Sequence, residues 1–263
     1  MSYEPEKYKI VKVENINEDI KLIRVKAPIN PLPGQFFQVS ILGVGECPLA
    51  SCSYSKNYVD MLVRNVGSVT SQIFKLKVGD KIWIRGPYGR GFPLTRLLDK
   101  DLILIAGGTG IAPITSLIEF IEKNRKHFGE IDIYFGFRNQ KYILLKDRIK
   151  EWKKKFNLSI ILDKPEKGWN GKTGYVRDFL QVRNKKNLAC LMCGPEIMME
   201  TATKKLNKFG VKNNQIYWSL ERRMECGFGV CGRCLLQDVY VCKDGPVFRY
   251  DKIKEKLENE GGK

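Results

Sequence analysis

The chain has 263 residues, of which 43% are hydrophobic, and a formal net charge of +17. This length exceeds that of most single domains, so we expect two domains and a small appendage. Lysines are spread along the sequence without a basic tail, and the aromatic residues form no stacking motif, which disfavours a nucleic-acid-binding protein. We interpret the basic excess as a surface property that favours an acidic partner subunit or anionic cofactors.

The N-terminus, MSYEPEKYKI, has no apolar core, and no run of eighteen apolar residues occurs in the sequence. We therefore expect neither a secretion signal nor a membrane anchor, and we place the protein in the cytoplasm.

Short alternating segments rich in β-branched residues, separated by turn residues, occupy the first part of the chain, at residues 8–15, 19–27, 31–41, 58–67 and 79–89. Such spacing predicts an antiparallel β-barrel domain over residues 1–98.

From residue 99 onward, continuous apolar runs alternate with segments of helical periodicity. The pattern predicts strands at 102–108, 131–137, 158–163, 188–194 and 215–220, and helices at 113–126, 145–156 and 195–210. A doubly wound parallel-sheet α/β domain is therefore expected over residues 99–220. Residues 251–263 are expected to form a charged tail, as a solvated helix that frays at its glycines.

Two glycine turns follow predicted strands of the α/β domain. Gly107, Gly108 and Gly110 separate an apolar strand from a helix whose N-terminus could hold a pyrophosphate, although a simple tight turn is the alternative. Cys193-Gly194-Pro195 follows a later strand and also precedes a helix. Both turns should lie at the carboxyl edge of the sheet, so we expect one shared crevice.

In the predicted barrel, Arg64, Gly67 and Thr70 could together hold a phosphate group. The alternative is a threonine helix cap beside a solvent-facing arginine. His127 lies among charged residues, as expected of a surface histidine. No Ser–His–Asp or paired-carboxylate arrangement is found, so we expect no catalytic side chain and assign the chemistry to cofactors.

Four of the eight cysteines, Cys226, Cys231, Cys234 and Cys242, have the spacing C-x4-C-x2-C-x7-C. A disulfide framework would need an oxidising compartment, and a zinc site commonly uses two C-x2-C pairs. The spacing instead favours plant-type [2Fe–2S] ligation. Glycines at 227, 229 and 232 support this interpretation, because they can adopt positive φ and let backbone N–H groups approach sulfur. Cys47, Cys52 and Cys190 are expected to be small buried hydrophobic residues.

The order of barrel, GGTGIAP, CGP and cysteine loop resembles the ferredoxin–NADP reductase superfamily, in the branch of electron-transfer subunits with a C-terminal [2Fe–2S] cluster. This branch includes subunits of dihydroorotate dehydrogenase, sulfhydrogenase and anaerobic sulfite reductase. The segments GECPLASCSY, SLERRMECGFGVCGRC and YVCKDGPVF are most similar to the flavin-binding subunit of the anaerobic sulfite reductase. The resemblance implies an NADH- or NADPH-oxidising flavoprotein that passes electrons to an iron–sulfur subunit and to a siroheme subunit, which reduces sulfite.

The resemblance also implies the binding residues. Flavin (FAD) contacts fall on Pro48, Leu49, Ala50, Ser51, Leu62, Val63, Arg64, Val69 and Thr70. Nicotinamide dinucleotide contacts fall on Gly107, Gly108, Thr109, Gly110, Ala112, Pro113, Cys193, Gly194 and Pro195. Arg138, which follows the predicted strand at 131–137, is a further candidate that could reach a 2′-phosphate, although it is equally an ordinary ribose or surface contact. The four cysteines would be the metal ligands in a domain at residues 221–250.

One departure from the family pattern concerns the flavin motif. Cys47 replaces its arginine and Ala50 stands where its serine would be, so the usual hydroxyl partner of flavin N5 is missing unless Ser51, Cys52 or a backbone N–H takes over.

Alternative functions remain open from the sequence. The same module could serve dihydroorotate dehydrogenase or a sulfhydrogenase, and a zinc-binding or nucleic-acid-binding protein is a lesser alternative.

Overall fold

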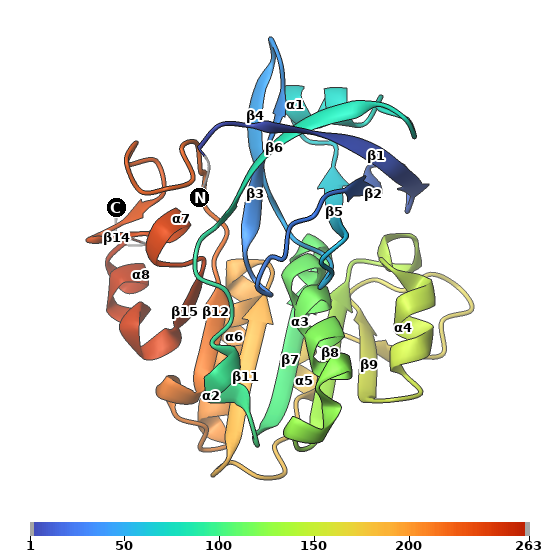
Figure 1. The fold of residues 1–263 in the computed structure, drawn as a ribbon. Coiled ribbons are helices and arrows are strands. Elements are labelled where there is room, and N and C mark those ends of the chain that lie inside the picture. The colour runs from blue at the N-terminus through green and yellow to red at the C-terminus, as the bar shows by residue number, and fades with distance from the viewer. Residues whose placement is uncertain (1–2, 261–263) are drawn as a thin grey trace. The chain divides into compact units, whose positions relative to one another are not determined.

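A computed structural model describes residues 3–260 of the chain (Figure 1). It divides into two compact units, which are described separately. The first contains residues 1–92, 115–120 and 221–247, and the second contains residues 93–114, 121–220 and 248–263. Within the described residues, no helix has the length and apolar character needed to cross a membrane.

The first unit is built on a six-stranded antiparallel barrel sheet with the order β4-β3-β6-β1-β2-β5. Its strands are β1 (Glu6–Asn15), β2 (Ile20–Lys26), β3 (Phe36–Ile41), β4 (Gly45–Ala50), β5 (Tyr58–Arg64) and β6 (Lys81–Tyr88). Alternate residues of these strands fill one core, including the fully buried Phe37, Val39 and Val63. The predicted barrel is confirmed.

Strand β4 was not among the predicted strands. Its sequence, GECPLA, contains Pro48, which cannot donate a backbone hydrogen bond to a neighbouring strand. The structure places β4 at an edge of the sheet, where proline is tolerated, with Pro48 opposite Gln38 of β3. A short helix, α1 (Ser68–Ile73), follows β5.

The second unit is built on a seven-stranded sheet with the order β10-β9-β8-β7-β11-β12-β15. Its strands are β7 (Asp101–Gly107), β8 (Ile131–Phe137), β9 (Asn157–Leu162), β10 (Lys172–Thr173), β11 (Leu188–Cys193), β12 (Ile216–Ser219) and β15 (Val247–Arg249). Its helices are α2 (Leu94–Leu97), α4 (Lys146–Trp152), α5 (Val176–Phe179), α6 (Glu196–Lys208), α8 (Lys254–Glu260) and both ends of α3 (Ile111–Lys123), whose middle, residues 115–120, is grouped with the first unit. Along this order, every neighbouring pair from β10 to β12 is parallel.

The direction of strand addition reverses between β7 and β11. From β7 the chain adds β8 and then β9 on one side, whereas β11 and β12 lie on the other side (Figure 1). Because parallel crossovers are right-handed, this reversal places α3 and α6 on opposite faces of the sheet. The predicted doubly wound α/β fold is confirmed, and its switch point lies between β7 and β11.

The C-terminal cysteine segment packs with the barrel, in the first unit. It contains β13 (Leu235–Leu236), β14 (Val239–Tyr240) and a short helix, α7 (Val241–Asp244). The chain then returns to the second unit through β15 and α8. The predicted tail helix is present as α8, while the glycines at which fraying was expected, Gly261 and Gly262, lie outside the described residues.

Candidate functional site

The first glycine turn connects β7 to α3 through a 3₁₀ turn, Gly108–Gly110. Gly108 is exposed and has a φ of +54°, and a Cβ added to it would have no atom within 4 Å. The first turn of α3 carries no acidic residue, so no carboxylate within that turn offsets the positive dipole end of the helix. An open, glycine-lined helix N-terminus fits a pyrophosphate group.

The second glycine turn lies directly against the first. A Cβ on Gly110 would come within 2.5 Å of the carbonyl oxygen of Cys193, and one on Gly194 would come within 2.9 Å of the backbone nitrogen of Gly107. Glycine is therefore required where the two backbones meet. The predicted meeting of the two turns at the carboxyl edge is confirmed, and they lie at the switch point between β7 and β11.

The other residues predicted to contact the dinucleotide differ in exposure. Pro195 and Arg138 are exposed, Arg138 directly after β8, and Thr109 is half-buried. Ala112 is 4% exposed and Pro113 is buried within the first turn of α3. The buried residues shape the helix terminus, whereas Gly108, Arg138 and Pro195 are open to a ligand.

The residues predicted to contact flavin also divide by exposure. Pro48, Leu49 and Ala50 on β4 are half-buried, as is Val69 on α1. In contrast, Ser51 and Val63 are fully buried, and Leu62 is 5% exposed. Side chains that touch a ligand should be accessible when the ligand is absent. The accessible flavin candidates therefore lie on β4, on α1 and at Arg64 at the end of β5.

The suggested phosphate-binding group in the barrel has partners within the protein. The Thr70 hydroxyl accepts hydrogen bonds from the N–H groups of Val66 and Gly67, both at 3.0 Å. Thr70 is the third residue of α1, not its cap, and the N-cap is Gly67. Arg64 Nε lies 3.2 Å from Asp19 Oδ2 in an exposed ion pair that water screens. Arg64 can exchange this weak partner for a phosphate.

The altered flavin motif has a buried neighbourhood. The Ser51 hydroxyl donates to the carbonyl of Ser53 at 2.9 Å, and the N–H groups of Ser51 and Cys52 donate to Gln35 and Asp60. These groups are therefore engaged within the barrel. Burial, together with the charge of Glu46, raises the pKa of the Cys47 thiol to about 12, so it remains protonated. Cys47 cannot supply the positive charge of the arginine that it replaces.

The four cysteines of the C-terminal loop approach one another as two pairs. The backbone N–H of Cys231 donates to Cys226 Sγ at 3.5 Å, and the backbone N–H of Cys242 donates to Cys234 Sγ at 3.4 Å. In the described part of the chain, no three His, Cys, Asp or Glu side chains gather as a single metal ion would require. A [2Fe–2S] cluster instead needs two thiolates at each of its two irons. The paired arrangement fits such a cluster.

Backbone N–H groups of the cysteine loop point at its sulfur atoms. The N–H of Gly229 donates to Cys242 Sγ at 3.2 Å, and the N–H of Val230 donates to Cys226 Sγ at 3.4 Å. Gly227, Gly229 and Gly232 have φ values of +87°, +80° and +79°, which confirms their predicted conformation. Burial acts to raise the pKa of Cys226, but the surrounding backbone N–H groups lower it to about 6, which favours the thiolate that binds metal.

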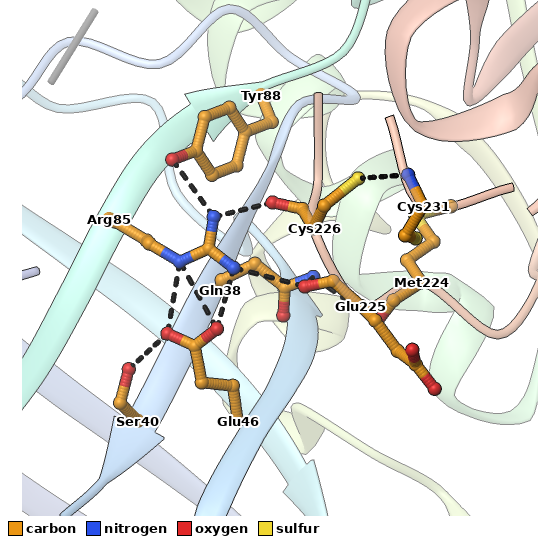
Figure 2. A network of polar contacts seen from close by, with 9 residues as sticks. All are labelled: Gln38, Ser40, Glu46, Arg85, Tyr88, Met224, Glu225, Cys226 and Cys231. Carbon is orange, nitrogen blue, oxygen red and sulfur yellow. Dashed lines mark hydrogen bonds and ion pairs between the residues drawn. The ribbon is translucent and has the colours of Figure 1, made fainter. Parts of the chain in front are cut away.

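A buried polar network beside this loop was not predicted from the sequence (Figure 2). Arg85 of β6 is 8% exposed and forms a forked ion pair with Glu46 of β4, with Nε–Oε1 and Nη2–Oε2 distances of 2.9 and 2.5 Å. Its guanidinium also donates to the carbonyl oxygens of Glu225 and Cys226. The sequence feature that could have revealed this network is a row of polar residues on β3 and β6. These residues alternate with core residues and therefore lie on the outward face of the sheet.

His127 has the surface position that was predicted, because it is exposed in a 3₁₀ turn, Arg125–His127. Cys52 and Cys190 are fully buried, as predicted. The same prediction was wrong for Cys47, which is partly exposed because it lies on the edge strand β4.

Three family models match the chain in succession. The oxidoreductase FAD-binding domain matches residues 7–92, and the oxidoreductase NAD-binding domain matches residues 104–204. The iron-sulfur cluster binding domain of dihydroorotate dehydrogenase B matches residues 221–254. FAD, a nicotinamide dinucleotide and an iron–sulfur cluster are therefore the cofactors of this chain.

Curated relatives match over nearly the whole chain. Sulfhydrogenase 1 subunit gamma of Pyrococcus furiosus is 35% identical over 95% of this chain and 92% of its own length. A probable dihydroorotate dehydrogenase B (NAD(+)) electron transfer subunit of Thermococcus kodakarensis is 36% identical over 94% of this chain and 98% of its own length. A specific resemblance to the flavin-binding subunit of anaerobic sulfite reductase is not borne out by these relatives.

A solved structure of an NADH-dependent reduced ferredoxin-NADP oxidoreductase, described in connection with flavin-based electron bifurcation, is 27% identical. It superposes with a TM-score of 0.76 over 96% of this chain and 93% of the compared chain. The chain belongs to the FAD- and NAD-binding ferredoxin reductase superfamily, as an NAD-dependent flavin electron-transfer subunit with an iron–sulfur domain of the dihydroorotate dehydrogenase B type.

Proposed function

We propose that this protein takes electrons from NADH and delivers them singly, through a [2Fe–2S] cluster on its cysteine loop, to a catalytic partner subunit. The observation that carries the proposal is the arrangement of the four cysteines in two pairs, with backbone N–H groups directed at the sulfurs of Cys226, Cys234 and Cys242. When bound, the cofactors supply complementary chemistry: nicotinamide releases two electrons together, flavin accepts a pair and releases single electrons, and the cluster carries one at a time.

The chain's own residues bind and orient these groups. The α3 N-terminus and Gly108 hold the dinucleotide pyrophosphate, with Pro195 on the adjoining turn. Arg138 contacts the ribose or, in NADPH, its 2′-phosphate. Pro48, Leu49, Ala50, Val69 and Arg64 hold the flavin, and Cys226, Cys231, Cys234 and Cys242 bind the irons. We divide the chain into a flavin domain at 1–98, a dinucleotide domain at 99–220, a cluster domain at 221–250 and a tail at 251–263.

We propose that the partner subunit is of the dihydroorotate dehydrogenase or sulfhydrogenase type. Support comes from full-length relatives with those names, each at least 35% identical. A sulfite reductase complex, with an iron–sulfur subunit and a siroheme subunit, is the second candidate. It is favoured by the seven-residue gap between Cys234 and Cys242, which fits that branch better than the longer gap expected of the dihydroorotate branch.

The test uses the purified chain alone and in its copurified complex. Alone, it should pass electrons from NADH to ferricyanide or a viologen, yet leave orotate, protons and sulfite unreduced, because the described residues show no side-chain arrangement suited to those reactions. The acceptor that the complex reduces then identifies the partner. Cys226→Ser and Cys234→Ser should lose iron and sulfide but keep flavin, whereas Cys190→Ala should keep all three, since Cys190 lies in β11. A full cluster in both serine variants would disprove the ligand assignment.

A further inference from the structure

The outward face of the barrel sheet carries a row of polar residues that is nevertheless buried. Gln38 and Ser40 alternate along β3 with the core residues Phe37 and Val39, so they point away from the barrel core. Gln38 lies directly opposite Arg85 on β6. Gln38, Ser40 and Arg85 are 0%, 4% and 8% exposed, which means that another segment covers this face.

The covering segment is the start of the cysteine loop. Gln38 Nε2 donates to the carbonyl oxygens of Met224 and Glu225 at 3.2 and 3.1 Å. Arg85 donates to the carbonyl of Glu225 at 3.0 Å and to that of Cys226. Three consecutive carbonyls, ending at the first cysteine, therefore accept hydrogen bonds from two barrel side chains (Figure 2).

Arg85 is itself held in place on several sides. Glu46 binds the guanidinium edge formed by Nε and Nη2, and in turn accepts a hydrogen bond from Ser40 at 2.6 Å. The hydroxyl of Tyr88 accepts from Arg85 Nη1 at 3.3 Å. The Tyr88 ring also packs against the loop, because a Cβ on Gly227 would come within 2.9 Å of it. A guanidinium fixed in this way is preorganised to hold the loop.

The contacts reach the sulfur atoms through one residue. The carbonyl of Cys226 is bound by Arg85, while its Sγ accepts from the N–H groups of Val230 and Cys231 at 3.4 and 3.5 Å. We propose that Arg85 and Gln38 are positioning residues that clamp the cysteine loop to the FAD-binding barrel and so fix the cluster relative to the flavin. This inference rests on the proposed cluster at Cys226–Cys242.

The clamp acts on main-chain carbonyls, so its function depends on donor geometry and not on the side chains of the loop. Lysine at position 85 would keep the positive charge but present a single ammonium group, which cannot span Glu46 and two carbonyls with the geometry of a fork. Arg85→Lys should therefore behave more like Arg85→Met than like the wild type. Full rescue by lysine would mean that charge alone is required.

The experiment compares Arg85→Met and Gln38→Leu with the wild type, all as purified holoprotein. The wild type must first show the absorption and electron paramagnetic resonance of a [2Fe–2S] cluster, and its failure to do so would count against the proposed function instead. Arg85→Met should lose iron to a chelator at least about tenfold faster, as expected for lost hydrogen bonds to a charged donor, and Gln38→Leu, which loses neutral hydrogen bonds, about threefold faster. Amide hydrogen exchange in residues 224–242 should accelerate, and the midpoint potential of the cluster should shift.

Two comparisons separate positioning from general stability. Arg24→Met is the control, because it breaks another forked ion pair of the barrel, in which Arg24 binds Asp60 at 2.6 and 2.9 Å. This pair joins β2 to β5, whereas Gln38 and Arg85 lie on β3 and β6. Arg24→Met should destabilise the barrel and leave the cluster signals unchanged. Gln38→Leu removes two hydrogen bonds from an uncharged donor and breaks no ion pair, so it should destabilise the barrel less than Arg85→Met does. If Arg85→Met does not fold, the rates of iron loss and amide exchange in Gln38→Leu alone test the proposal.

The proposal is overturned if both variants keep wild-type rates of iron loss and wild-type exchange in residues 224–242. The proposal is also overturned if Arg24→Met changes the cluster signals as much as Arg85→Met and Gln38→Leu do.

Discussion

At the residue scale, the structure assigns different tasks to the glycines of the dinucleotide turns. Gly110 and Gly194 are required by the protein itself, because a Cβ on either would collide with the adjoining turn at less than 3 Å. Gly108 has no such neighbour, and its open surroundings leave room for a ligand. A substitution at Gly108 therefore tests binding, whereas one at Gly110 or Gly194 tests folding.

We expect Gly108→Val to weaken NADH binding by about tenfold or more, because its side chain would occupy the space for the pyrophosphate and remove hydrogen bonds to a charged group. The flavin should remain bound. Stopped-flow bleaching of the flavin band at increasing NADH concentration measures the effect. Gly168→Val is the matched control, since Gly168 also has positive φ, +90°, and open surroundings, in the same unit. Equal loss in both variants would assign the effect to backbone strain.

At the scale of elements, the last part of the chain is more integrated than a solvated tail. Strand β15 joins the edge of the parallel sheet beside β12, and Tyr250 stacks on Trp218 with ring centroids 4.7 Å apart. Ile253 is 1% exposed. The sequence expectation of a charged tail beginning at residue 251 is thus correct for the exposed face of α8 but misses the residues that anchor it.

Removing this stack should loosen the C-terminal elements. We expect Tyr250→Ala to lower the free energy of unfolding by about 1–3 kcal/mol, from the lost aromatic contact and buried area of a half-buried ring. Tyr250→Phe keeps the ring and should retain most of the stability. Urea denaturation followed by tryptophan fluorescence reports both. A Tyr250→Ala protein as stable as the wild type would show that α8 and β15 contribute little.

At the scale of the whole molecule, the positive charge is less dispersed than the sequence suggested. A pocket of about 690 Å³ in the α/β unit is lined by six basic residues. None of the described residues that line it is acidic. The basic residues are Arg96, Lys100, Lys185, Lys186, Lys212 and Arg249. Lys100 directly precedes β7, and Lys186 lies shortly before β11. The pocket is therefore at the amino edge of the sheet, opposite the glycine turns.

We expect this basic pocket to strengthen association with an acidic face of the partner subunit, in line with electrostatic steering. Lys185→Glu combined with Lys212→Glu should weaken association with copurifying subunits about tenfold at low salt, with a smaller effect at high salt. NADH should still reduce the flavin, because the dinucleotide turns lie at the other edge. Lys150→Glu with Lys153→Glu changes the net charge equally at the end of α4 and should have little effect. Equal weakening in both double variants would indicate a response to net charge alone.

Local patterns in the sequence were sufficient for the two folds and for most of the proposed site. Alternation identified the barrel strands, apolar runs identified the parallel strands, and glycine and cysteine spacing located the turns that are proposed to bind ligands. These features depend on residues a few positions apart, which share an element or a turn. Strand β4 escaped because Pro48 is unusual in a strand and is tolerated only through its edge position.

Only the tertiary structure revealed how the cysteine loop is held. Arg85 and Cys226 are 141 positions apart, and Gln38 and Met224 are 186 positions apart. Their contacts use main-chain carbonyls, which every residue possesses, so no side-chain pattern in the loop announces them. The same holds for the six cations that share one pocket from separate segments. The sequence by itself determined which elements and cofactor motifs form, whereas long-range packing decided which polar side chains meet, because such contacts depend on chain topology.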